Sequence, residues 1–242
     1  MRILAILAVL SFDSFAAESA AHPLSAKEFR DLAKQCLPDA PISTLRAIAK
    51  VESAYNPLAI SINYPDKATT TLGLDEGIVE LSRQPASVRE AVQWTKWFYA
   101  RGLTVSIGLM QVNTEHLPAL GLSLEQAFEP CANLKAGWTI LNVKYRAAAA
   151  VIEKGQLALH AAISSYNRGS PAAGFTNGYV EKVLAATTPA SSIPQFGGLT
   201  VKQQFALIPQ REYPQSIPPM QDAAQEDPNA APTQVSWSSK VK

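Results

Sequence analysis

The sequence predicts a mainly α-helical protein with one compact domain. Apolar residues recur at helical spacing behind helix-start motifs, beginning with the capping box Ser25-Ala26-Lys27-Glu28. Residues 58–84 mix apolar and turn residues, which predicts an irregular insertion or a small hairpin before Gly108. Beyond about Thr187, eight of the 17 prolines occur among many Gln and Ser, which predicts a disordered tail.

Each helix is predicted from its own start and stop signals. The first ends near Cys36 before Pro38, and the second ends before Asn56-Pro57, because proline disfavours helical geometry in the residue before it. Gly102 and Gly155 are expected to end two later helices. The predicted helices are, in order, 26–36, 43–54, 87–102, one from Gly108 or Leu109, a short one after the box Ser123-Leu124-Glu125-Gln126, a long one following Asn133, 156–166 and 179–184.

The sequence predicts three parts of the chain: a signal peptide, a domain and a tail. Residues 1–17 read as a signal peptide, with Arg2 followed by a short apolar run and small residues, and the alternative is an apolar core segment. Residues 25–187 form the predicted domain and 188–242 the Pro-rich tail. We therefore expect an exported protein, in which the two cysteines, Cys36 and Cys131, form a disulfide. Two unpaired buried thiols are the alternative.

Composition and missing motifs narrow the chemistry. The 21 Lys and Arg balance 20 Asp and Glu, so nothing favours nucleic acid as a partner. The sequence contains no Cys/His cluster, and its three histidines are far apart, so no metal site is predicted. They are His22, His116 and His160. The sequence also has no G-x-S-x-G elbow and no phosphate-binding Gly loop. No cofactor is expected, and carboxylate chemistry remains.

Glu52 is the candidate catalytic carboxylate. Leu45, Ile48, Ala49 and Glu52 share one face of the second helix, and three of the four are apolar. A carboxyl group on such a stripe loses contact with water, which raises its pKa and suits a general acid at neutral pH. The alternative is a helix-end glutamate that turns to solvent or caps a neighbour.

Two further segments carry side chains suited to a glycan site. In Ser106-Ile107-Gly108-Leu109-Met110-Gln111-Val112-Asn113, the amides of Gln111 and Asn113 suit sugar hydroxyl and acetamido groups, although an ordinary loop-to-helix junction is the alternative. In Ser164-Ser165-Tyr166-Asn167, the Tyr166 hydroxyl could bond a carboxylate, and a core aromatic is the alternative.

Taken together, Glu52-Ser53, Gly108-Leu109-Met110-Gln111 and Tyr166-Asn167 stand in the order and approximate spacing of the motifs of soluble-lytic-transglycosylase-like domains. The chain resembles this family over about residues 32–184, and most of all its specialised branch in type IV secretion and conjugation systems. The stretches 83–87, 106–113, 128–134 and 178–180 are typical of that branch.

The resemblance implies a lysozyme-like (α+β) domain with a glycan-binding cleft, acting on peptidoglycan strands in the periplasm. Glu52 would be acid and then base, Ser53 would orient the local backbone, and Tyr166 would position Glu52. Contacts between the tail and components of a secretion or conjugation complex are also expected. The substrate-binding residues implied by the resemblance are Ser53, Met110, Gln111, Asn113, Tyr166, Asn167 and Tyr179.

The family's reaction needs one carboxylate. Glu52 would protonate the oxygen between N-acetylmuramic acid and N-acetylglucosamine, then take the proton from the muramyl C6 hydroxyl as it attacks C1, which gives a 1,6-anhydro sugar. Ordinary glycosidases use a pair of carboxylates, and Glu115 is the candidate if a second acid exists. A hydrolytic muramidase and a glycan-binding assembly factor without turnover are the alternatives.

Overall fold

The computed structural model describes residues 22–63, 81, 83–152, 154–187 and 199–208. The predicted signal peptide lies outside these residues. The elements are α1 (Ala26–Cys36), α2 (Ile42–Ser53), β1 (Ile60–Asn63), α3 (Val88–Tyr99), β2 (Thr104–Ile107), β3 (Val112–Asn113), the 3₁₀ helix η1 (Thr114–His116), α4 (Leu117–Leu120), α5 (Leu124–Ala127), α6 (Pro130–Ile152), α7 (Gln156–Arg168), α8 (Ala173–Thr176), α9 (Tyr179–Thr187) and α10 (Val201–Phe205).

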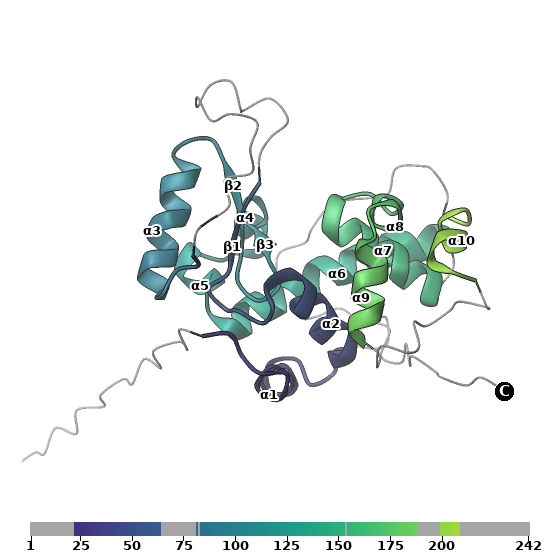
Figure 1. Cartoon of the computed structure of the whole chain (residues 1–242), viewed down its shortest axis with the longest axis horizontal. Coiled ribbons are helices and arrows are strands. Elements are labelled where there is room, and N and C mark those ends of the chain that lie inside the picture. Colours follow the sequence, from purple (N-terminus) through teal and green to yellow (C-terminus); the bar gives the residue numbers. More distant parts are fainter. Residues whose placement is uncertain (1–21, 64–80, 82, 153, 188–198, 209–242) are drawn as a thin grey trace, which may run out of the picture.

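The long helix α6 connects two groups of elements. A three-stranded antiparallel sheet in the order β1-β2-β3 lies at one end with α3, and α7 to α10 lie at the other (Figure 1). The sheet register pairs Ile60 with Ile107, and Ser106 with Asn113. Helix α6 packs against α7, and α2 packs against α9. The architecture is therefore mainly helical with a small sheet, as the sequence predicts.

Capping explains where several helices begin. In α1 the Ser25 hydroxyl accepts from the Glu28 N–H at 3.2 Å and the Glu28 carboxylate accepts from the Ser25 N–H at 2.7 Å, so the predicted box is complete. The start of α3 has the sequence of a capping box, Ser87-Val88-Arg89-Glu90, but only half of the box forms. Ser87 accepts from the Glu90 N–H, but the Glu90 carboxylate pairs with Arg83 instead, which lowers the pKa of Glu90 to about 2.

Three details of the predicted helices are wrong. No helix begins at Gly108, because Gly108 and Gln111 adopt positive φ angles of 75° and 47° and form a turn that leads into β3. Helix α6 begins at Pro130, so Asn133 lies inside its first turns and its side chain is buried. No helix is predicted between 156–166 and 179–184, but the short helix α8 forms there.

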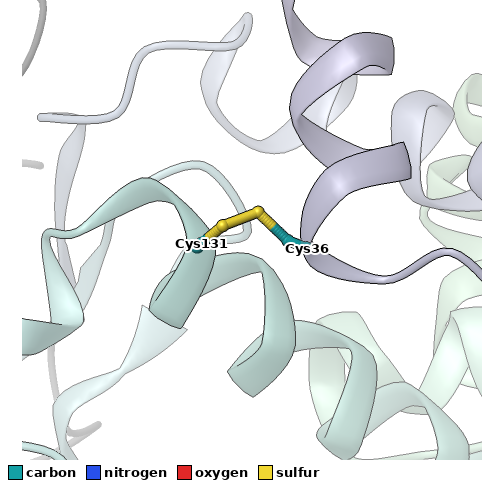
Figure 2. Close-up of a disulfide and its surroundings, with 2 residues drawn as sticks. All are labelled: Cys36 and Cys131. Atoms are coloured by element: carbon teal, nitrogen blue, oxygen red, sulfur yellow. A yellow bond between two sulfur atoms is a disulfide. The ribbon is translucent and has the colours of Figure 1, made fainter.

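The predicted disulfide is confirmed. Cys36 ends α1 and Cys131 lies in the first turn of α6, with Cα atoms 5.5 Å apart (Figure 2). The bridge closes a loop that contains α2 and the whole sheet. It therefore ties the first helix to the helix that supports the cleft.

Part of the predicted tail is folded. Gln204 of α10 is fully buried, its amide oxygen lies 2.5 Å from Nδ1 of His160, and the Phe205 ring packs against Phe175. Ile208 is also buried. The prediction of disorder is thus wrong for residues 199–208, because a capping box at Thr200 and a buried polar contact give this short segment a place on α7 and α8. The rest of the tail lies outside the described residues.

Among the described helices, none is both long and apolar enough to cross a bilayer.

We predict that removing the disulfide, through Cys36→Ser with Cys131→Ser, destabilises the domain by up to about 4 kcal/mol, because the closed loop is long. Chemical denaturation of the double variant and of the wild type measures this. A wild-type protein whose denaturation midpoint does not change on reduction would contradict the prediction.

We predict that a chain ending at Thr187 loses roughly 1–3 kcal/mol of stability relative to one ending at Ile208, because it exposes the surface that α10 covers and removes Gln204 from His160. Thermal melts of the two truncations make the comparison. Equal melting temperatures would show that α10 contributes nothing to the fold.

Candidate active site

Glu52 sits in the last turn of α2, on the apolar stripe that the sequence predicts. Leu45, Ile48 and Ala49 on that stripe are fully buried. Directly after the helix, Ala54 and Tyr55 both adopt left-handed backbone angles, with φ of 50° and 65°. Two consecutive non-glycine residues in this region are strained, and such strain tends to gather at functional sites. The strained exit ends α2 at the carboxyl group.

The hydroxyl of Tyr179 donates a hydrogen bond to Oε1 of Glu52. Burial raises the pKa of Glu52 from 4.5 to about 7, and the bond from Tyr179 opposes part of that rise. Burial and the nearby Glu52 raise the pKa of Tyr179 well above its ordinary value, so this hydroxyl remains a donor. Glu52 therefore exchanges its proton near neutral pH, which general acid–base catalysis requires.

Tyr179 reaches Glu52 because α9 begins beside α2. The side-chain oxygen of Asn177 accepts from the Tyr179 N–H at 2.9 Å and fixes the start of that helix. Tyr166 was expected to position Glu52, but its hydroxyl donates instead to the carbonyl of Met110 at 2.6 Å. Tyr166 thus holds the neighbouring turn, and Tyr179 holds the carboxyl group.

The turn at residues 108–111 is organised by Asn133. The Asn133 side chain accepts from the Met110 N–H at 2.8 Å and donates to the carbonyls of Ile107 and Ala127 at 2.9 and 2.8 Å. Only glycine fits at position 108, because a Cβ there would lie 2.3 Å from Nδ2 of Asn133. Sequence reasoning missed this role, although a polar residue on the otherwise apolar inner face of a helix is a signal for it.

Ser53 supports this turn from α2, and Met110 of the turn packs against α6. The Ser53 hydroxyl lies 2.8 Å from the Leu109 carbonyl oxygen and 3.0 Å from that of Ala49, and so connects α2 to the turn. The Met110 side chain is fully buried against Gly137, where a Cβ would clash with it. Met110 is therefore absent from the cleft lining, contrary to the substrate-binding role that the resemblance implies.

A polar cleft of about 490 Å³ opens beside Glu52. Of the expected substrate-binding residues it exposes Gln111, Asn113, Tyr166 and Asn167, but not Ser53 or Tyr179. Gln111 also donates to the carbonyls of Ala59 and Gly108, so it fixes the cleft wall. The remaining lining residues are Ser61, Asn63 and Ser106 of the sheet, His116 of η1, Ile140 and Lys144 of α6, and Ser165, Arg168 and Gly169 at the end of α7.

Glu52 is the only carboxylate among the described residues that line this cleft. Glu115, the candidate second acid, is exposed and lies outside the lining. Within the same described ranges, no group of three His, Cys, Asp or Glu side chains could hold a metal ion. The arrangement provides one proton-exchanging carboxyl group beside a polar cleft.

Such a site, on a mainly helical domain, is typical of an enzyme that uses acid–base catalysis in a polar cleft. The family model of the Transglycosylase SLT domain matches residues 33–187, and the chain belongs to this family. It is a lytic transglycosylase of peptidoglycan, as the resemblance in the sequence predicts.

Similar proteins cover most of the chain. Protein virB1 of Rhizobium radiobacter is 38% identical over 180 residues, which are 74% of this chain and 69% of the relative. Type IV secretion system protein virB1 of Brucella suis biovar 1 (strain 1330) is 38% identical over 178 residues, 69% of this chain and 68% of the relative. Protein virB1 of Agrobacterium fabrum is 35% identical over 180 residues, 74% and 67% of the two chains. No solved structure matches the chain significantly.

We predict that Glu52→Gln stabilises the fold at pH 8 but not at pH 4. The pKa of Glu52 is about 7 in the fold against an ordinary 4.5, so the folded state binds more protons between these values and the wild type loses stability as pH rises through them. Glutamine has no such loss. Urea denaturation should show a gain of roughly 1–3 kcal/mol at pH 8 and none at pH 4. A difference that does not change with pH would contradict the raised pKa.

Proposed function

We propose that the chain cleaves the β-1,4 bond between N-acetylmuramic acid and N-acetylglucosamine and forms a 1,6-anhydromuramyl end. The observation that supports this is the single carboxyl group at the cleft. Hydrolysing glycosidases place two carboxyl groups about 5–9.5 Å apart, one to protonate the leaving oxygen and one to act as nucleophile or activate water. Among the described residues Glu52 has no such partner in the cleft, and in the proposed reaction the nucleophile comes from the substrate.

In the proposed first step, the protonated carboxyl group of Glu52 gives its proton to the glycosidic oxygen as the bond from that oxygen to C1 breaks. In the second, the muramyl C6 oxygen bonds to C1, and the Glu52 carboxylate takes the proton that the C6 hydroxyl loses. The carboxyl group ends protonated and no water is consumed. A pKa of about 7 suits both proton transfers, because neither form of the group is strongly favoured at neutral pH.

Tyr179 acts as a positioning residue in this scheme. Its hydroxyl occupies one oxygen of the Glu52 carboxyl group, so the other oxygen is the one that exchanges protons with the substrate. The same bond strengthens when Glu52 becomes a carboxylate, because hydrogen bonds to charged acceptors are stronger than neutral ones. It thereby stabilises the form that must accept the C6 proton.

We further propose that this cleavage serves a type IV secretion or conjugation apparatus in the periplasm. Support comes from the relatives named as type IV secretion system proteins and from the signal peptide read in residues 1–17. The Pro-rich sequence after Ile208 is the candidate contact with other components of such a system.

We predict that purified glycan strands digested by the wild type carry 1,6-anhydro ends, lighter by one water than hydrolytic ends in mass spectra. Glu52→Gln should lower turnover about 10²–10⁴-fold or more, since one group serves both proton transfers. Glu115→Gln is the matched control and should retain wild-type turnover, because Glu115 is exposed and outside the cleft lining.

A different outcome would contradict each of these expected results. Near-normal turnover in Glu52→Gln would overturn the assignment of the catalytic group. A digest that carries only reducing ends would keep Glu52 but make the enzyme a muramidase. A large loss in Glu115→Gln would indicate a pair of acids.

A further inference from the structure

One stripe of α6 faces the turn and the cleft. Asn133, Gly137, Ile140 and Lys144 are spaced by 4, 3 and 4 residues, which places them on one side of a helix. Asn133 bonds the turn, and Gly137 makes room for Met110. Ile140 and Lys144 then line the cleft itself. The face of α6 that contacts the turn at residues 108–111 therefore also places the Lys144 side chain in the lining of the cleft.

Among the described residues that line this cleft, most of the charged side chains are basic. Lys144 is only 7% exposed, and Arg168 lies at the exposed end of α7 on the same cleft. Burial and the nearby Lys144 lower the pKa of His116, so this ring is largely neutral at pH 7. The one lining carboxyl group among the described residues, Glu52, is partly protonated at that pH. A cation with little water around it attracts an anion more strongly than a cation at the surface does.

The two sugars of the strand differ in charge. N-acetylglucosamine is neutral, whereas each muramyl residue carries a lactyl group whose carboxyl is either free or joined to a stem peptide with carboxylates of its own. The Ser and Asn side chains of the cleft are neutral and hydrogen-bond hydroxyl or amide groups of either sugar. A buried ammonium group can distinguish the sugars where these side chains cannot.

We infer that Lys144, with Arg168 at the rim, binds a carboxylate carried by the muramyl residue and so sets which sugar stands beside Glu52. The inference rests on the proposed function, because it assumes a strand in which the two sugars alternate. The same cleft position would otherwise accept either sugar, and only a muramyl residue with its C1 at Glu52 gives the proposed product.

Steady-state kinetics on three substrates test this. The substrates are peptide-bearing strands, strands stripped of peptides with free lactyl carboxylates, and stripped strands whose carboxylates have been converted to primary amides. The variants are Lys144→Met, Lys144→Arg and, as the matched control, Lys135→Met on the exposed side of the same helix. Melting temperatures establish that each variant is folded.

We predict that Lys144→Met lowers kcat/KM about tenfold on a carboxylate substrate, mainly through KM, which is the size expected for one hydrogen bond to a charged group. The loss on the amide strands should be less than twofold. Lys144→Arg should retain most of the activity, and Lys135→Met all of it. A loss on stripped strands identifies the lactyl carboxylate as the ligand, and a loss confined to peptide-bearing strands identifies the stem peptide.

An equal loss on amide strands, or no loss on any substrate, would overturn the inference. Should Lys144→Met fail to fold, the wild type alone decides. Its kcat/KM on at least one of the two carboxylate-bearing substrates should exceed that on the amide strands by the same factor, and equal values on all three would overturn the inference as well. A wild type that cleaves none of the three would instead contradict the proposed function.

Discussion

A carboxyl group that leaves water must be held protonated or be given compensating partners, and the site is built around this constraint on Glu52. The apolar stripe of α2 removes the group from water, and the strained exit at Ala54 and Tyr55 ends the helix at that point. The single hydroxyl of Tyr179 then prevents the pKa from rising further. The result is a group near the middle of its titration at neutral pH, which is the state that one residue needs to serve as acid and then as base.

The turn at residues 108–111, which forms part of the cleft wall, is held by side chains from three helices. Asn133 fixes the turn at residues 108–111, and Ser53 and Tyr166 bond two carbonyls of the same turn, so α2, α6 and α7 meet there. The disulfide from Cys36 anchors the start of α6 to α1. These contacts are buried or partly buried and tie the turn to three helices, while the polar lining of the cleft remains available to a glycan strand.

The sequence predicts the parts of this site that depend on local pattern. The spacing of Leu45, Ile48 and Ala49 placed Glu52 on a buried face, and the capping box at Ser25 located α1. With only two cysteines, Cys36–Cys131 was the one disulfide that could form within the chain. Features that depend on contacts distant in sequence were not predictable in this way. Asn133 shapes a turn more than 20 residues earlier in the chain. The choice between Tyr166 and Tyr179 depends on how α9 packs beside α2. Helix α10 is too short to show periodicity, and its place depends on the partner that Gln204 finds in His160.

The most direct test of this account is the titration of Glu52 itself. The ¹³C NMR shift of its side-chain carboxyl carbon, in protein labelled at glutamate and assigned by the loss of one signal in Glu52→Gln, reports the protonation state across the pH range. We expect a midpoint near pH 7, well above the ordinary 4.5. A midpoint at or below the ordinary value would show that Glu52 is ionised throughout the working range, and the single-carboxyl mechanism would then lose its acid.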